Sequence, residues 1–164
     1  EIIDFEALRL TNQQSVHLMK DYKPRLICFV MDGQNPNSGI TSMIGADGLA
    51  DDIKEAGISG RICYTGSHVS ALPREVMSNS NVDFVLINEG VYGLISLIET
   101  HLKNKLNSCP GLGYKEGNDI IINQDKLVPN DRMHINLPGY KWDLLPQKNK
   151  TLDFYRDHSW HSYL

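Results

Sequence analysis

The sequence has no long hydrophobic run, no excess of positive charge and no close pair of cysteines. None of its apolar runs approaches the roughly 18 to 20 residues that cross a bilayer. The formal net charge is -4, whereas nucleic-acid binding needs clustered Lys and Arg. We therefore expect a cytoplasmic protein that binds neither nucleic acid nor a membrane.

Only three cysteines are present, Cys28, Cys63 and Cys109, and they are widely separated with no C-x-x-C pair. By themselves they should not build a zinc or iron-sulfur site. Cys28 and Cys63 lie inside apolar runs, where a reduced thiol packs as a small hydrophobe. We expect all three to be structural.

Two phosphate-binding motifs are also absent. The chain contains neither the G-x-G-x-x-G of dinucleotide sites nor the G-x-x-x-x-G-K-[ST] of nucleoside triphosphate sites. A site built around phosphate is therefore disfavoured.

Short apolar runs alternate with helical patterns along the first two thirds of the chain. This alternation is typical of a parallel sheet flanked by helices, and it predicts an α/β fold with a doubly wound parallel sheet. The continuous run at 25–31, RLICFVM, predicts a strand covered on both faces. The other predicted strands are 61–64 and 82–87, and 1–4 is predicted to be the end of a strand. The predicted helices are 11–20, 41–56, 73–77 and 91–106, and Gly57 is placed to end the second of them. Helical spacing predicts that Val16 and Met19 of the first helix, and Ile95 and Ile98 of the last, face inward.

The pattern of apolar residues changes after residue 106. Two short strand-like runs around a turn at 115–118 predict an appended β-hairpin within 107–128. From residue 129 onward Pro138, Gly139 and Pro146 interrupt every pattern, so 129–164 is interpreted as an extended C-terminal connector. Residues 1–106 then form the sheet domain.

Three loops should carry any ligand, because ligands of open parallel sheets bind beyond the carboxyl ends of the strands. These loops are 32–40, 65–70 and 88–90, and all three contain small or amide residues. Such residues let backbone N–H groups approach a ligand. The alternative is that Gly33, Gly66 and Gly90 only make turns.

Three stretches of the chain together resemble a known family. CFVMDGQNPNSGITSMIGADGLADDIKEAG, ICYTGSHVSALPREVM and VDFVLINEGVYGLISLIE are similar to the cobalamin-binding domains at the N-terminus of radical S-adenosylmethionine (radical SAM) enzymes. GLGYKEGNDIIINQDKL and LPGYKWDLLP look like the bridge before the catalytic barrel of those enzymes. The resemblance implies a flavodoxin-like (Rossmann-type) sheet that takes the cobalamin nucleotide tail between its strand ends. It also implies that the cobalt face is offered to a neighbouring domain.

The resemblance assigns cofactor-binding residues to each loop and no catalytic or metal-binding residue. Asn88 replaces a glycine of the family's turn, and Asn tolerates left-handed backbone well. Each residue also has an ordinary structural alternative: a lone loop histidine such as His68 is more often a hydrogen-bonding surface group than a metal ligand. The implied cobalamin-binding residues are Gly33, Gln34, Asn35, Thr41 and Ser42 from the first loop, Gly66, Ser67 and His68 from the second, and Asn88, Glu89 and Gly90 from the third.

Two motifs of the family's chemistry are missing. D-x-H-x-x-G, which supplies a histidine below the cobalt, would follow a first strand that we expect this chain to lack together with its helix. C-x-x-x-C-x-x-C, which holds a [4Fe-4S] cluster for S-adenosylmethionine, is also absent. The chain alone should therefore not be catalytic. The resemblance implies that the cluster and S-adenosylmethionine belong to a radical SAM domain in the same parent chain or another chain, which carries out methyl transfer or related radical chemistry.

Two alternatives to cobalamin binding remain at this point. One is a flavodoxin-like interaction or sensory module without cobalamin; the other is a flavin-binding relative, disfavoured because no Ser/Thr-rich phosphate loop follows the first strand. In either case a missing first strand would leave an unpaired apolar edge at 1–4 or 25–31. That edge predicts association with another chain or a homo-oligomer.

Overall fold

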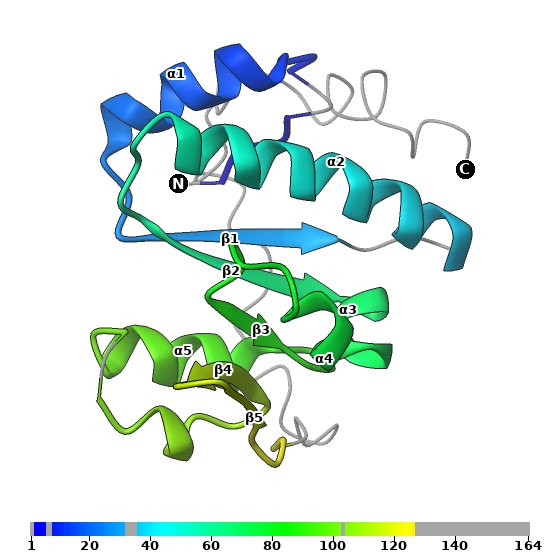
Figure 1. The fold of residues 1–164 in the computed structure, drawn as a ribbon, viewed down its shortest axis with the longest axis vertical. Helices are drawn as coiled ribbons and strands as arrows, with labels where there is room; N and C mark the ends of the chain where they lie inside the picture. Colours follow the sequence, from blue (N-terminus) through cyan, green and yellow to red (C-terminus); the bar gives the residue numbers. More distant parts are fainter. Residues whose placement is uncertain (1, 6–7, 32–35, 103, 127–164) are drawn as a thin grey trace, which may run out of the picture.

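The computed structural model describes residues 2–5, 8–31, 36–102 and 104–126, without the side chains of 36–41. A five-stranded sheet lies at the centre, with its strands in chain order (Figure 1). The first three strands are parallel, and the last two form an antiparallel hairpin that extends the sheet beyond β3. The strands are β1 (Leu26–Met31), β2 (Arg61–Gly66), β3 (Phe84–Leu86), β4 (Leu112–Glu116) and β5 (Asp119–Ile122).

Helices cover both faces of this sheet, as the alternating sequence pattern predicts. Apolar side chains of the first four helices form one core with β1 and β2, and α5 forms a second core with β3 and β4. This arrangement is an α/β fold compatible with the flavodoxin-like class. No helix in the described part of the chain is long and apolar enough to cross a membrane. The helices are α1 (Asn12–Tyr22), α2 (Pro36–Glu55), α3 (Ser67–Ala71), α4 (Pro73–Val76), α5 (Val91–Glu99) and the 3-10 helix η1 (Leu106–Ser108).

The start of α1 is fixed by a capping box. The Thr11 hydroxyl accepts a hydrogen bond from the Gln14 backbone N–H, and the Gln14 side chain accepts one from the Thr11 N–H. These two bonds satisfy donors that a helix end otherwise leaves unpaired. Val16 and Met19 are buried against the sheet, so the predicted helix and its inward face are confirmed.

Helix α2 begins earlier than predicted. Residues 36–40 were expected to be loop, yet α2 starts at Pro36. Proline suits the first helical position, since its fixed φ is helical and its missing N–H has no partner there in any helix. The predicted end is confirmed, because Gly57 follows α2 with φ +74°.

Strand β1 lies at one edge of the described sheet, with β5 at the other, and the prediction that both faces of β1 are covered is wrong. Phe29 and Met31 are buried in the core with α1 and α2, but Val30 on the other face is 69% exposed. Residues 2–4, expected to end a strand, form none. Val30 lies on the face of the sheet that packs with α5, where Leu26 and Cys28 of β1 are partly buried against the second core.

Helix α5 is shorter than predicted, and a different side of it packs against the rest of the fold. It ends at Glu99, and the left-handed backbone of His101 and Leu102 prevents its continuation to residue 106. A Cβ at Gly93 would overlap the carbonyl of Pro110, so this face of the helix packs closely on the chain before β4. Ile95 and Ile98, expected to face inward, are exposed on the other side of the helix.

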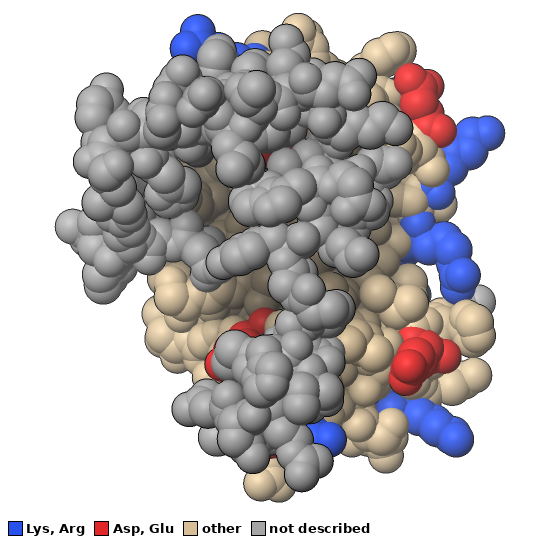
Figure 2. All heavy atoms as spheres, turned by 180° about the vertical axis from the view of Figure 1, so that it is seen from behind, with Lys and Arg blue, Asp and Glu red and all other residues tan. Residues whose placement is uncertain are grey.

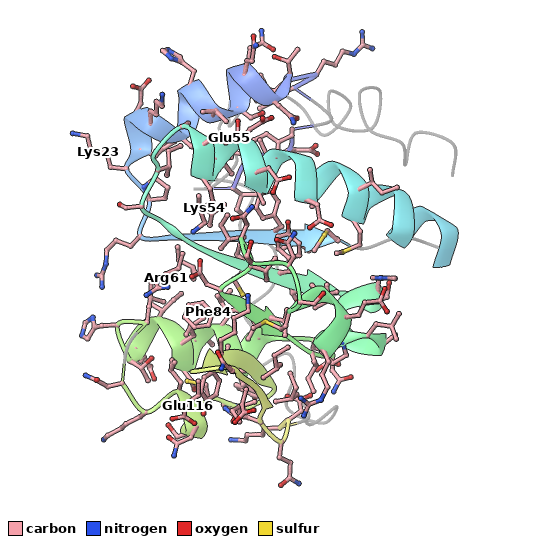
Figure 3. The ribbon with its side chains drawn as sticks, viewed as in Figure 1. Lys23, Lys54, Glu55, Arg61, Phe84 and Glu116 are labelled. Atoms are coloured by element: carbon pink, nitrogen blue, oxygen red, sulfur yellow. The ribbon has the colours of Figure 1, made fainter. Side chains whose placement is uncertain are left out.

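Charged side chains are distributed without a dominant sign on the visible surface. Figure 2 shows Lys and Arg alternating with Asp and Glu along the right-hand margin of that view. At the end of the sheet where β2 begins, Arg61 and Lys54 lie close together (Figure 3). Both bind Asp83: Arg61 Nη1 lies 2.6 Å from its carboxylate and Lys54 Nζ lies 3.2 Å away.

Asp83 joins the start of β3 to β2 and to the end of α2. Its carboxylate also accepts a 2.8 Å hydrogen bond from the Ile62 backbone N–H. Burial raises the pKa of Asp83, but the hydrogen bonds from Ile62 and Arg61 and the charge of Lys54 outweigh burial and hold this pKa below its usual range. Asp83 is therefore an ionised, fully engaged group at this end of the fold.

Candidate functional site

A cavity of about 440 Å³ lies at the carboxyl ends of the parallel strands. Its inner wall is apolar and includes Val30, Leu86 and Leu94. Its rim comes from the end of β2 and from the loop between β3 and α5. The rim residues that the sequence singles out are Gly66, Asn88, Glu89 and Gly90, joined by Thr65.

Gly66 is the last residue of β2 and not a loop residue, since β2 runs two residues further than predicted. It is paired with Met31, the last residue of β1. With φ +136°, Gly66 adopts a backbone conformation that other residues rarely adopt, and a Cβ there would overlap the Met31 carbonyl oxygen. Glycine is required at this position for the close approach of two strand ends.

The third loop has the backbone that the sequence predicts. Asn88 has φ +56° and Gly90 has φ +64°, both in the left-handed region. The Asn88 side-chain amide donates a 2.7 Å hydrogen bond to Asp125 Oδ2, from the segment after the hairpin. The loop is therefore held from outside by a residue that arrives after β5.

Ser70 joins the second and third loops, although it is not among the predicted cofactor-binding residues. Its hydroxyl donates a 2.8 Å hydrogen bond to the Gly66 carbonyl and accepts a 2.7 Å hydrogen bond from the Asn88 backbone N–H. The first of these bonds is the usual bond of a helical serine to the carbonyl four residues before it. This local hydrogen bond can be expected from the sequence, but the contact with Asn88 depends on the tertiary fold.

His68 lies apart from the rim. It is in α3 and lines a separate cavity of about 370 Å³ on the sheet face covered by α2 and α4. Asp47 and Glu75 line the same cavity. The structure thus brings Gly66 together with 88–90, but it places the histidine of the second loop beside a different set of side chains.

The Asp47 carboxylate in this second cavity is already engaged. Its Oδ1 accepts hydrogen bonds from the Tyr64 hydroxyl at 3.1 Å and from the Asn79 amide at 2.9 Å. Burial, followed by the nearby Asp47 carboxylate, raises the pKa of Tyr64, so its hydroxyl stays protonated and keeps donating. This group fastens α2 to β2 and is best explained as structural.

The remaining predicted residues are not part of the described rim. Gly33, Gln34 and Asn35 lie outside the described residues. Thr41 and Ser42 were expected where the helix starts, but they lie inside α2, which already begins at Pro36. Ser67 is the exposed first residue of α3.

Helix α5 begins at the cavity. Its N-cap is Gly90, which offers no side chain to accept from the first-turn N–H groups. Backbone N–H groups at a helix start favour negatively charged or strongly accepting groups. Within the described ranges no cluster of three or more His, Cys, Asp or Glu could hold a metal ion.

Comparison with solved structures finds a similar fold in structures of the enzyme OxsB. The chain is similar to the cobalamin-dependent S-adenosylmethionine radical enzyme OxsB with aqua-cobalamin and S-adenosylmethionine bound, at 21% identity and a TM-score of 0.60, over 78% of this chain and 17% of that one. OxsB with aqua-cobalamin alone gives 21% identity and a TM-score of 0.56, over 72% and 16%. No protein-family model and no curated protein matches the chain. At this identity the likeness concerns the fold, and the chain spans about a sixth of OxsB.

Proposed function

We propose that this chain is the cobalamin-binding region of a radical SAM enzyme. The observation that carries the proposal is the cavity at the strand ends, in which Gly66 and residues 88–90 meet on one rim. The fold similarity to cobalamin-bound OxsB supports it. In this proposal the cavity receives the nucleotide tail of cobalamin.

The cavity suits that part of the cofactor. A volume of about 440 Å³ is within the usual range for small-molecule sites and fits the tail, while the corrin ring would lie outside. The apolar wall with Val30, Leu86 and Leu94 suits a flat aromatic base. The free N–H groups at the start of α5 suit the phosphate of the tail.

Residues of this chain would bind and orient the cofactor and perform no bond-making step. Asn88 and Glu89 are exposed at the rim, where they can hydrogen-bond the amide arms of the corrin. Gly33, Gln34 and Asn35 would join them, since their loop follows Met31, which is paired with Gly66. Thr41, Ser42, Ser67 and His68 remain predictions without a place on the described rim.

The bound cobalamin would supply methyl transfer or assist a radical step in the parent enzyme. The [4Fe-4S] cluster and S-adenosylmethionine would come from a radical SAM domain, in the same chain or another, that faces the exposed corrin. The residues of this chain then serve to hold the cofactor at the sheet edge and to leave its cobalt face open.

A bulky side chain at Val30 tests the proposal. Val30 lines the cavity and is exposed, so Val30→Trp should fill the cavity without disturbing the core. Ile98→Trp is the matched control, because Ile98 is also an exposed apolar residue but is not among the cavity-lining residues. Each purified chain is mixed with hydroxocobalamin and passed over a desalting column, and corrin absorbance in the protein fraction is measured.

We expect the wild type and Ile98→Trp to retain corrin, and Val30→Trp to lose at least about 90% of it. A tenfold weaker binding corresponds to roughly 1.4 kcal/mol of binding free energy. Equal corrin retention by all three chains would show that cobalamin binds outside this cavity. No retention by any of them would favour the flavodoxin-like interaction module without cobalamin.

A further inference from the structure

Cys28 and Cys63 are far apart in the sequence but adjacent in the sheet. They are register partners on the parallel strands β1 and β2, and both are free thiols. Neighbouring strands lie about 4.8 Å apart, which falls within the range of about 4.4 to 6.8 Å between Cα atoms that a disulfide spans. The strand register therefore places the two Cα atoms within disulfide range.

The two thiols lie in different surroundings. Cys63 is completely buried, whereas Cys28 is half-buried and lines the 440 Å³ site cavity. Cys28 also lines a second cavity of about 320 Å³ on the other side of β1. Because Cys63 is completely buried, a small reagent that enters the site cavity reaches Cys28 before Cys63.

The hydrogen bond between the thiols makes Cys28 the more reactive of the two. A hydrogen bond from the Cys63 thiol lowers the pKa of Cys28, although burial opposes this. The same hydrogen bond raises the pKa of Cys63, and burial and the nearby Asp83 carboxylate add to the rise. Because the thiolate is the nucleophile, Cys28 should react first while Cys63 stays protonated as the donor.

We propose that Cys28 and Cys63 form an oxidisable dithiol at the wall of the site cavity, in which a small hydroperoxide oxidises Cys28 and Cys63 then closes a disulfide. The Cys28 thiolate attacks one peroxide oxygen, the O–O bond breaks, and the leaving hydroxide takes a proton to become water, or an alcohol if the peroxide is organic. The Cys63 thiol then gives its proton to the hydroxyl of the Cys28 sulfenic acid as its sulfur attacks the Cys28 sulfur. An S–S bond forms, the S–O bond breaks and a second water leaves.

The electrons balance in this sequence. The two thiols lose two electrons and become one disulfide, and the peroxide takes up both. A dithiol reductant restores the thiols by exchange through a mixed disulfide. The proposal needs the cavity and the strand register but not cobalamin, so it stands or fails separately from the proposed function.

The test uses the full chain with one equivalent of hydrogen peroxide, followed by alkylation of the remaining thiols and mass spectrometry. We expect the wild type to lose two hydrogens and to give a linked pair of peptides that contain Cys28 and Cys63. Cys28→Ser should lose this product entirely. Cys63→Ala should also lose it, and should instead accumulate a sulfenic acid at Cys28 that a 1,3-dione reagent traps.

Cys109→Ser is the matched control and should keep the disulfide at the wild-type yield, since Cys109 is buried in the same core as Cys63 but lies before β4 and is not the register partner of either cysteine. Circular dichroism verifies that each variant is folded before it is scored. A wild-type chain that stays fully reduced, a disulfide that includes Cys109, or a link between two chains would each overturn the proposal.

Discussion

Gly66 carries more structural constraint than any other rim residue. It is the last residue of β2, it faces the end of β1, and its φ of +136° is one that residues with a side chain avoid. Its carbonyl also accepts a hydrogen bond from the Ser70 hydroxyl, and that hydroxyl accepts one from the Asn88 backbone N–H. The rim geometry at the second and third loops thus depends on one glycine.

Replacing Gly66 with alanine should destabilise the fold strongly. The Cβ would overlap the Met31 carbonyl and the backbone would be strained, which together should cost about 3 kcal/mol or more of unfolding free energy. Gly45→Ala is the control: Gly45 is inside α2 with open space around it, so alanine there should stabilise by about 0.5 to 1 kcal/mol. Urea unfolding followed by circular dichroism measures both. Equal stability of Gly66→Ala and wild type would refute the close approach.

At the scale of elements, Asp83 joins three segments at the end of the sheet opposite the rim. Its folded-state pKa is depressed, so its contribution to stability is fully present above its unfolded pKa of about 3.9 and is lost as the pH falls through the folded pKa. Asp83→Asn should lower the unfolding free energy at pH 7 by about 1 to 3 kcal/mol, because the amide cannot pair with Lys54 and Arg61.

The same variant should also lose less stability than the wild type when the pH is lowered from about 5 to 3. Denaturant titrations at several pH values measure this. Asp119→Asn is the control, since Asp119 is exposed on β5 and should change stability by no more than about 0.5 kcal/mol. Parallel pH profiles for wild type and Asp83→Asn would show that Asp83 is not held ionised.

The elements themselves were largely predictable, because hydrophobic periodicity and capping residues act locally. Thr11 marks the start of α1, and the turn before β5 follows from Gly117. Periodicity could not decide which apolar side of α5 packs against the sheet. Ile95 and Ile98 fit an inner face by spacing, yet the close approach of Gly93 to Pro110 turns them outward.

The candidate site was predictable only in part, because the sequence fixes loop positions but not the face on which each side chain lies. The ends of parallel strands meet at one edge, so Gly66 and 88–90 were expected together and are found together. His68 is the second residue of α3 and lines the other cavity, with Asp47 and Glu75. The pairing of Cys28 with Cys63 depends on strand register, which spacing along the chain does not reveal.

At the scale of the whole molecule, β1 lies at one edge of the described part of the sheet, where it pairs only with β2 and carries the exposed Val30. We predict that the chain associates with a second copy through this edge. Sedimentation velocity at increasing concentration should show a species larger than the monomer, and Val30→Lys should shift the distribution toward monomer. A wild-type chain that stays monomeric at every concentration would contradict the prediction.

The most direct test of the cobalamin site is a titration of the isotopically labelled chain with hydroxocobalamin, in which NMR spectra record the shifts of the backbone amide signals. Binding of the nucleotide tail at the strand ends predicts that the largest shifts cluster at Thr65, Gly66 and residues 88–91, with little change at Asp47 and Glu75. Shifts that centre on Asp47, His68 and Glu75, or no shifts at all, would contradict the account.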